Sequence, residues 1–245
     1  MKNQISQYKN TPITFQYKAP SQSLLDSIKD QSGPVELSQN QRIQVDCRYF
    51  KKGIKGSHPK IFLREKLRNA MNEALSLLDP SYGFVVFDGY RSRETQEGLF
   101  SSYSDEIKSK NPSFTKEELY LETRKYVAHP DEPSRFEVPP HLSGGAVDIG
   151  LTFKGKPLNM GTDFDDLTDK ASTDYFEKKY ETSLGERETE WVAIRENRRI
   201  LFHSLKAVGF TNWKFEWWHY DMGNCVWAQE LGQNWIYDKM EIKDE

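Results

Sequence analysis

The feature that most constrains the fold is a short, uninterrupted apolar run followed at once by an acidic residue and a glycine. The run, Phe84-Val85-Val86-Phe87, is rich in β-branched and aromatic residues and ends at Asp88-Gly89. Such a run is typical of a buried strand at the centre of a sheet. Loops at the ends of such strands often carry function, so we expect functional residues directly after Asp88.

Extended and helical patterns alternate on both sides of this strand. Apolar residues recur at three- and four-residue intervals from 61 to 78, which predicts a helix that ends at Asp79-Pro80. Further helices are predicted at 93–109, 116–127 and 188–208, strands at 42–49, 146–153 and 213–222, and a hairpin turn at 155–157. This order predicts an α+β fold, with a central, mainly antiparallel sheet flanked by helices.

Two helix ends are marked by their own residues. Thr115 with Glu118 forms a capping-box pattern before the helix at 116–127. Gly209 follows the helix at 188–208 as its C-terminal cap. Residues 1–40 are polar and show little periodicity, so we expect an N-terminal arm that lies over a single domain formed by residues 41–245.

Charge and cysteine content exclude several classes of protein. The chain has 34 Lys+Arg against 37 Asp+Glu and a net charge of -3, which argues against a nucleic-acid binder. Two cysteines cannot make a disulfide framework, and Cys47 and Cys225 stand far apart without CxxC spacing, which excludes a zinc–thiolate cluster. No long apolar stretch predicts a membrane span, and the first residues lack a signal-peptide core. We expect a cytoplasmic location, or a periplasmic one if a leader has been removed.

Three residues form a candidate metal site. A catalytic zinc site takes three protein ligands from His and carboxylates and leaves a position for water. His141, Asp148 and His219 could supply that set. On a regular strand His141 and Asp148 would lie on opposite faces and far apart, but Gly144, Gly145 and Ala146 between them allow the backbone to turn tightly.

Two further residues are candidates for catalysis. Glu216 stands three residues before His219, so a bulge or a strand end is needed there if both side chains are to reach one site. Glu216 would then act as general base, with its pKa raised by the surrounding tryptophans. Arg91 follows the buried strand and the flexible Gly89, which suits an oxyanion-stabilising guanidinium.

Each of these segments also has an ordinary structural explanation. A lone arginine after a strand is usually an ion-pair partner, an isolated Glu-x-x-His occurs often by chance, and clustered aromatics are usually core packing. His58, His129 and His203 are interpreted as surface or core residues. The co-occurrence of the three segments with the small-residue turn favours metal chemistry.

These segments together resemble the zinc D-alanyl-D-alanine dipeptidases of the vancomycin-resistance type, a family of D,D-peptidases that share the hedgehog signalling-domain fold. The family pattern Ser-x-His-x-x-Gly-x-Ala-x-Asp is matched from His141 to Asp148. Glu-Trp-Trp-His-Tyr is matched at 216–220, and Asp-Gly-Tyr-Arg at 88–91. Weaker matches occur at 160–165 and 197–210. The resemblance covers about residues 42–225.

The resemblance implies one Zn²⁺ per chain, a small dipeptide substrate, above all D-Ala-D-Ala, and the same roles for the five residues named above. Two positions depart from the family pattern. Pro139 replaces a serine whose hydroxyl could contact the substrate, and Ser92 replaces a proline that often follows the arginine. Neither position belongs to the predicted metal set. The biological setting stays open between antibiotic resistance, recycling of cell-wall peptides and nutrient use.

Candidate substrate contacts are the acidic side chains of Asp88 and Asp165, which suit a substrate ammonium group, together with Tyr90 and Trp218. Two other functions remain open. One is a carboxypeptidase or endopeptidase acting on peptidoglycan stems, which would need an open cleft. The other is a zinc-bearing binding module without catalysis, which the presence of Glu216 disfavours.

Overall fold

The computed structural model describes residues 2–15, 33–131, 138–182, 185, 187–233 and 237–242 of the chain. Its helices are α1 (Lys2–Asn10), α2 (Arg48–Lys51), α3 (Glu65–Ser76), α4 (Arg93–Lys110), α5 (Lys116–Thr123), α6 (Glu188–Ala207) and α7 (Cys225–Leu231), with short 3-10 turns η1 (His141–Ser143), η2 (Asp169–Ala171) and η3 (Tyr175–Glu177). Its strands are β1 (Pro34–Glu36), β2 (Ile43–Val45), β3 (Phe62–Arg64), β4 (Tyr82–Asp88), β5 (Ala146–Phe153), β6 (Lys156–Pro157), β7 (Thr211–Asn212) and β8 (His219–Asp221).

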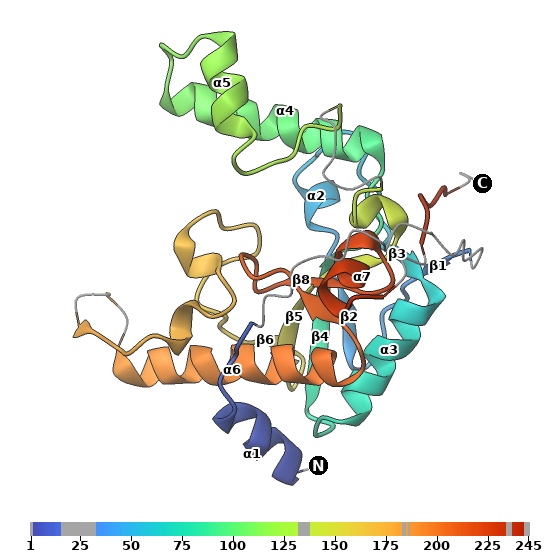
Figure 1. Cartoon of the computed structure of the whole chain (residues 1–245), viewed down its shortest axis with the longest axis vertical. Coiled ribbons are helices and arrows are strands. Elements are labelled where there is room, and N and C mark those ends of the chain that lie inside the picture. Colours follow the sequence, from blue (N-terminus) through green and yellow to red (C-terminus); the bar gives the residue numbers. More distant parts are fainter. Residues whose placement is uncertain are drawn as a thin grey trace.

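The main sheet has the strand order β2-β4-β5-β8-β7, and β6 pairs with one end of β5. Only β2 and β4 run parallel, and every other pair in this sheet is antiparallel. In Figure 1 the long helix α6 and the helix α3 lie beside the sheet, while α4 and α5 extend away from it as a helical hairpin. The predicted α+β fold with a mainly antiparallel sheet is confirmed.

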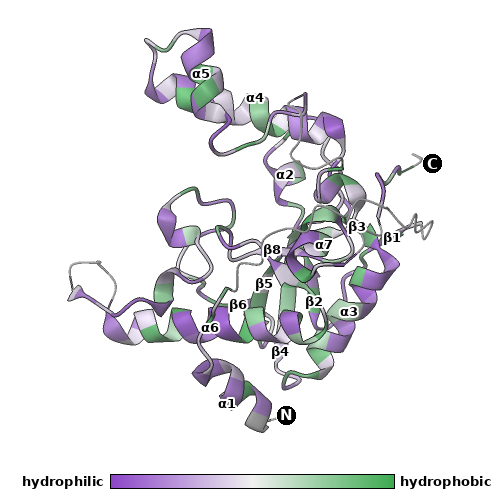
Figure 2. Cartoon of the chain, viewed as in Figure 1, coloured by the Kyte–Doolittle hydropathy of each residue, from purple (hydrophilic) through white to green (hydrophobic). Residues whose placement is uncertain are grey.

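The two central strands, β4 and β5, carry the core. Five consecutive residues of β4 and all but the last residue of β5 are buried. A strand buried on both faces reads as a continuous apolar run rather than an alternation, which is why the segment from Phe84 to Phe87 was recognisable. Figure 2 shows hydrophobic residues along these strands and polar residues on the outer surfaces of α3 and α6. None of the described helices is long and apolar enough to cross a membrane.

The predicted helices after β4 are present with small shifts at their ends. Helices α4, α5 and α6 begin at the predicted residues. Thr115 accepts a hydrogen bond from the Glu118 amide, and the Glu118 side chain accepts one from the Thr115 amide, which confirms the capping box. Gly209 follows α6 with a φ of +98°, a value that suits glycine at a helix end.

Three predicted segments are wrong in part. The segment 61–78 begins with the strand β3 before the helix α3, because residues 62–64 pair with β1 from the N-terminal region. The segment 42–49 is extended only at 43–45, where it pairs with β4, and turns into α2 at Arg48. Both differences depend on partners that local periodicity cannot show.

The third correction concerns residues 213–222, which are not one strand. Only His219–Asp221 is extended, and the residues before it form a turn that joins β7 to β8. The Glu216 amide donates to the Trp213 carbonyl, and the His219 amide to the Glu216 carbonyl. Aromatic residues here favour strand by propensity, but the turn is held by these local hydrogen bonds. The expectation that a strand end falls near Glu216 is confirmed.

The N-terminal region, expected as an arm, contributes to the body of the molecule where it is described. Helix α1 packs on α6, where Arg199 donates to the Lys9 carbonyl at 2.7 Å. Tyr8 and Leu37 are buried in the main hydrophobic core. The remainder of the predicted arm, at 16–32, lies outside the described residues.

Candidate metal centre

The turn between His141 and Asp148 is built on glycine. His141 lies in η1, which ends at Gly144 with a left-handed φ of +69°. A side chain at Gly144 would bring its Cβ within 2.6 Å of the Met240 sulfur. Glycine therefore meets two demands here, a backbone conformation and a close approach. The chain turns at this point and enters β5, which places Asp148 near His141 as predicted.

Strand register brings three polar residues side by side across the sheet. Asp148 on β5 lies opposite Asp88 on β4 and opposite His219 on β8. The register of β4 shifts between Val86 and Asp88, which is a β-bulge. Such a bulge adds one residue to its strand and re-aims the side chains that follow it. Asp88 therefore faces Asp148, a position that regular pairing would have given to Phe87.

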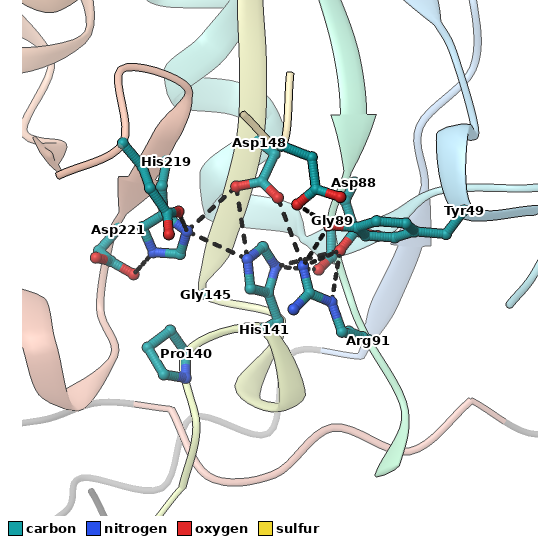
Figure 3. A network of polar contacts seen from close by, with 12 residues as sticks. Tyr49, Asp88, Gly89, Arg91, Pro140, His141, Gly145, Asp148, His219 and Asp221 are labelled. Carbon is teal, nitrogen blue, oxygen red and sulfur yellow. Dashed lines mark hydrogen bonds and ion pairs between the residues drawn. The ribbon is translucent and has the colours of Figure 1, made fainter. Parts of the chain in front are cut away.

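The three predicted ligands converge. Nδ1 of His219 lies 3.2 Å from Oδ1 of Asp148 and 3.2 Å from Nε2 of His141, and Nε2 of His141 lies 3.5 Å from Oδ1 of Asp148 (Figure 3). All three residues are buried, and they are the one group of potential ligands found in the described part of the chain. A tetrahedral zinc site with bonds of about 2.0–2.2 Å separates its ligand atoms by roughly 3.3–3.6 Å. The donor set therefore fits zinc in both chemistry and spacing.

Each histidine is oriented by a second contact on its other nitrogen. Nδ1 of His141 lies 2.7 Å from the Gly89 carbonyl oxygen, which can only accept, so the proton resides on Nδ1 and Nε2 keeps its lone pair. Nε2 of His219 lies 3.1 Å from Oδ1 of Asp221. Metal-binding histidines commonly use such partners, which fix the ring and its tautomer.

The charges of the cluster favour a bound cation. Burial alone would raise the pKa of Asp148, but the charges and hydrogen bonds of His141 and His219 outweigh it and hold that pKa well below its ordinary value. Burial would likewise lower the pKa of His219, but Asp221 and Asp148 raise it well above the usual range. Carboxylates that hold a proton on a buried imidazole create the same field that attracts a metal cation.

Glu216 lies at the edge of the cluster. One of its carboxylate oxygens is 3.9 Å from Nδ1 of His219, and 38% of its side chain is exposed, far more than for the three ligands. The surrounding protein partly shields the carboxyl group from water and so raises its pKa; the nearby His219 opposes this effect, and the Asp148 carboxylate reinforces it. The direction agrees with the expectation from sequence. Glu216 is close enough to act in the site and open enough to meet water.

Arg91 is fixed on the opposite side of Asp148. Its Nε donates to Oδ2 of Asp88 at 2.9 Å, and its Nη1 donates to Oε1 of Gln96 at 3.0 Å. Its guanidinium carbon lies 5.1 Å from the centre of the Tyr49 ring, and Nη2 is 3.6 Å from Oδ2 of Asp148. These contacts hold a guanidinium beside the cluster, as Figure 3 shows. They also give Arg91 the ion pair expected of an ordinary structural arginine.

The other candidate substrate residues lie in different surroundings. Asp165 has a φ of +70° and accepts a hydrogen bond from the Tyr49 hydroxyl at 3.3 Å. Asp88 and Tyr90 line a cavity of about 340 Å³, and none of the three candidate ligands lines it. Trp218 is only 3% exposed and packs in the core. Their roles toward substrate stay predictions.

Two residues at the site were missed from sequence. Tyr49 contacts both Arg91 and Asp165, but nothing local in its segment points to this role. Asp221 bonds His219, and here a signal existed. On a strand, residues two apart share a face, so the spacing from His219 to Asp221 could have shown a carboxylate directed at the same side.

Solved structures resemble the chain only loosely. A mutant vancomycin-resistance D,D-pentapeptidase, VanY, from a VanB-type resistance cassette and in complex with Zn(II), aligns with a TM-score of 0.41 and 14% identity over 89% of this chain and 94% of that one. The LdcB LD-carboxypeptidase aligns with a TM-score of 0.37 and 14% identity over 92% of this chain and 77% of that one. Likenesses at this level carry no argument about function.

Sequence relatives are closer. A D-alanyl-D-alanine dipeptidase of Synechocystis is 27% identical over 188 residues, which cover 73% of this chain and 75% of the relative. A D-alanyl-D-alanine dipeptidase of Enterococcus faecalis is 28% identical over 165 residues, covering 64% and 68% respectively. The model of the peptidase M15 family, described as D-Ala-D-Ala dipeptidase, matches residues 43–235. That span holds the three candidate ligands, Glu216 and Arg91, and the chain therefore belongs to the peptidase M15 family of D-Ala-D-Ala dipeptidases.

Proposed function

We propose that the chain hydrolyses D-Ala-D-Ala at a zinc centre held by His141, Asp148 and His219, with Glu216 as general base and Arg91 stabilising the developing negative charge. The observation that carries this proposal is the convergence of the three ligand atoms, at separations of 3.2, 3.2 and 3.5 Å, beside the partly exposed Glu216 carboxylate. When bound, zinc supplies Lewis-acid chemistry that polarises a carbonyl and makes water a better nucleophile.

Glu216 moves the proton. Its carboxylate lies at the exposed edge of the cluster, where it can accept a proton from the attacking water and later deliver it to the leaving amine. A carboxyl group with a raised pKa is a stronger base than an ordinary glutamate and also a competent acid once protonated. Both halves of the reaction therefore use the same side chain.

Arg91 stabilises the oxyanion that forms when water attacks the scissile carbonyl. Its guanidinium is held by Asp88, Gln96 and Tyr49 before substrate arrives, so little reorganisation is needed. Burial would lower the pKa of Arg91, but Tyr49 and the neighbouring carboxylates raise it, so the group stays charged. A fixed positive charge next to the ligands can stabilise the negative charge that develops on the carbonyl oxygen during the reaction.

The substrate ammonium group is assigned to Asp165 or Asp88. Asp165 keeps a left-handed backbone conformation that a non-glycine residue adopts at a cost, and the Tyr49 hydroxyl holds its carboxylate. Asp88 already pairs with Arg91 at 2.9 Å, so its charge is largely used within the site. Asp165 also forms an ion pair, but a longer and more exposed one, with Lys52 at 3.6 Å, so Asp165 is the stronger of the two candidates.

The test is a substrate panel run on the zinc-loaded protein. D-Ala-D-Ala, L-Ala-L-Ala, mixed-chirality dipeptides and an amine-blocked tripeptide ending in D-Ala-D-Ala are compared by release of free alanine. We expect turnover of D-Ala-D-Ala, little of the L,L-dipeptide, and slow turnover of the blocked tripeptide, which offers Asp165 no ammonium group. Efficient tripeptide hydrolysis would instead indicate a carboxypeptidase. Full activity without stoichiometric zinc would overturn the metal centre.

A further inference from the structure

We propose that Asp221 is a positioning residue that fixes His219 as a metal ligand, and that Asn224 holds Asp221 in place. This inference rests on the proposed zinc centre. The Asp221 carboxylate and the Asn224 amide form a buried network of polar side chains behind His219.

The two nitrogens of His219 face different partners. Nδ1 is directed at the ligand cluster, 3.2 Å from Oδ1 of Asp148, while Nε2 is directed away from it, 3.1 Å from Oδ1 of Asp221 (Figure 3). A carboxylate oxygen accepts hydrogen bonds, so this contact places the proton on Nε2. Nδ1 then carries the lone pair that a metal needs.

The Asp221 carboxylate is buried, in a position where a charged group is costly unless it makes specific contacts. Only 1% of the Asp221 side chain is exposed. Its Oδ1 contacts His219 and Asn224, whereas its Oδ2 is buried without a hydrogen-bond partner among the described residues. A buried carboxylate with one oxygen unpaired destabilises the fold. An apolar residue would avoid that cost but would make neither the contact with His219 nor the hydrogen bond with Asn224.

Asn224 connects this carboxylate to the surrounding structure. Its Nδ2 donates to Oδ1 of Asp221 at 2.6 Å and to the Gly145 carbonyl at 2.8 Å. Its Oδ1 accepts from the amides of Val226 and Trp227, both at 3.0 Å, and so caps the start of α7. One amide therefore fixes the beginning of a helix and the carboxylate behind His219. Through Gly145 it also reaches the turn between the other two ligands.

The expected consequence is a difference in metal affinity. A carboxylate partner makes the opposite ring nitrogen more basic and prevents the ring from rotating, and loss of such a partner typically weakens metal binding about 10- to 100-fold. Asp221→Asn keeps an oxygen that can accept from Nε2 but removes the charge. We expect Asp221→Asn to bind zinc about 10-fold more weakly, and Asp221→Ala, which removes both, to bind it up to about 100-fold more weakly.

The experiment measures zinc affinity by competition with a chromophoric chelator, and the visible spectrum after Co²⁺ replaces zinc. Glu177→Gln is the matched control, because its partly buried carboxylate pairs with Arg199 and the Ile13 amide rather than with a site histidine. We expect the control to match wild type in both measurements, and the Asp221 variants to show weaker zinc binding and an altered Co²⁺ spectrum. Wild-type affinity and spectrum in Asp221→Asn and Asp221→Ala would overturn the inference.

A second variant covers the case in which the Asp221 variants do not fold. Asn224→Asp keeps the oxygen that caps α7, since aspartate is as good a cap as asparagine, but replaces the donor to Asp221 with a like charge. We expect zinc affinity to fall about 10-fold while the fold, followed by circular dichroism, is kept. Unchanged affinity would contradict the inference. Absence of zinc from the wild-type protein would overturn the proposed zinc centre itself, and this result is distinguishable from unchanged affinity in the Asp221 and Asn224 variants.

Discussion

Glu216 lies in the turn before β8 and His219 begins that strand, yet their proposed tasks are separable. His219 directs a nitrogen into the ligand cluster, whereas the Glu216 carboxylate lies 3.9 Å away at its exposed edge. Because Glu216 is not one of the converging ligands, a change at this residue should affect proton transfer and leave metal binding intact.

Glu216→Gln is therefore expected to keep one zinc per chain and to lose about 10²- to 10⁴-fold in kcat, since glutamine cannot accept the proton. Zinc content by atomic absorption and steady-state kinetics on D-Ala-D-Ala check this. If the variant turned over at the wild-type rate, Glu216 would not be the base. If it lost zinc, its role would be structural.

Arg91 depends on shape as well as charge. Its fork of donors contacts Asp88 and Gln96 at once, and a lysine ammonium cannot reproduce that planar geometry. We expect Arg91→Lys to lower kcat by about 10²- to 10³-fold with a much smaller change in KM, as for loss of an oxyanion donor. A change confined to KM would assign Arg91 to ground-state binding.

Individual functional residues could be predicted from the sequence where residue type and local spacing define the chemistry. His141, Asp148 and His219 were predicted as ligands, and they converge. Tyr49 was not predicted, because it reaches Asp165 from a position 116 residues away in the chain. A contact of that kind depends on the fold and leaves no local pattern.

Where a helix or strand begins and ends depends on the other elements that it pairs with. The buried strand β4 was predictable because two-sided burial leaves a continuous apolar run. The short strand β3 was not, because its apolar residues also continue the periodicity of α3 and only its pairing with β1 makes it extended. The bulge in β4, which turns Asp88 toward Asp148, likewise arises from pairing.

The docking of α1 on α6 is expected to weaken in acid. Nε2 of His203 on α6 donates to the Thr11 carbonyl at 2.9 Å, and Tyr8 of α1 stacks on the same imidazole. Burial lowers the pKa of His203, and the hydrogen bond to Thr11 opposes this effect. The positive charges of Lys206 and Arg199 lower the pKa further, while the negative charge of Glu177 raises it, though less than Lys206 lowers it.

The direction of this pH effect on stability follows from the protons that the folded and unfolded chains bind. The neutral form is favoured in the folded state, so below the unfolded pKa of about 6.5 the unfolded chain binds more protons. The contribution is fully present above that pH and is lost as the pH falls toward the lower folded pKa. We expect the Tm of the wild type to fall more between pH 7.5 and 5.5 than that of His203→Gln, measured by thermal unfolding. Equal decreases would show that His203 does not titrate in this range.

The molecule as a whole should gain stability from metal. A ligand that binds only the folded state stabilises it by about 4 kcal/mol when free zinc is 1,000 times the Kd. For a chain of this size we expect chelation to lower Tm by roughly 8–16 °C under that condition. Calorimetry with and without chelator checks the shift, and a wild-type Tm that ignores chelator would contradict a zinc centre in this cluster.

The distribution of the ligands along the chain has a consequence for synthesis. His219 contacts Asp148 across 71 residues of sequence, and it does so only through the pairing of β8 with β5. A nascent chain that has emerged as far as β5 therefore presents two donors and no third. Contacts this distant form late, after the intervening chain has been organised. We therefore expect the site to bind zinc only after β7 and β8 have docked on β5, so that a ribosome-bound or truncated product lacking β8 would carry no metal.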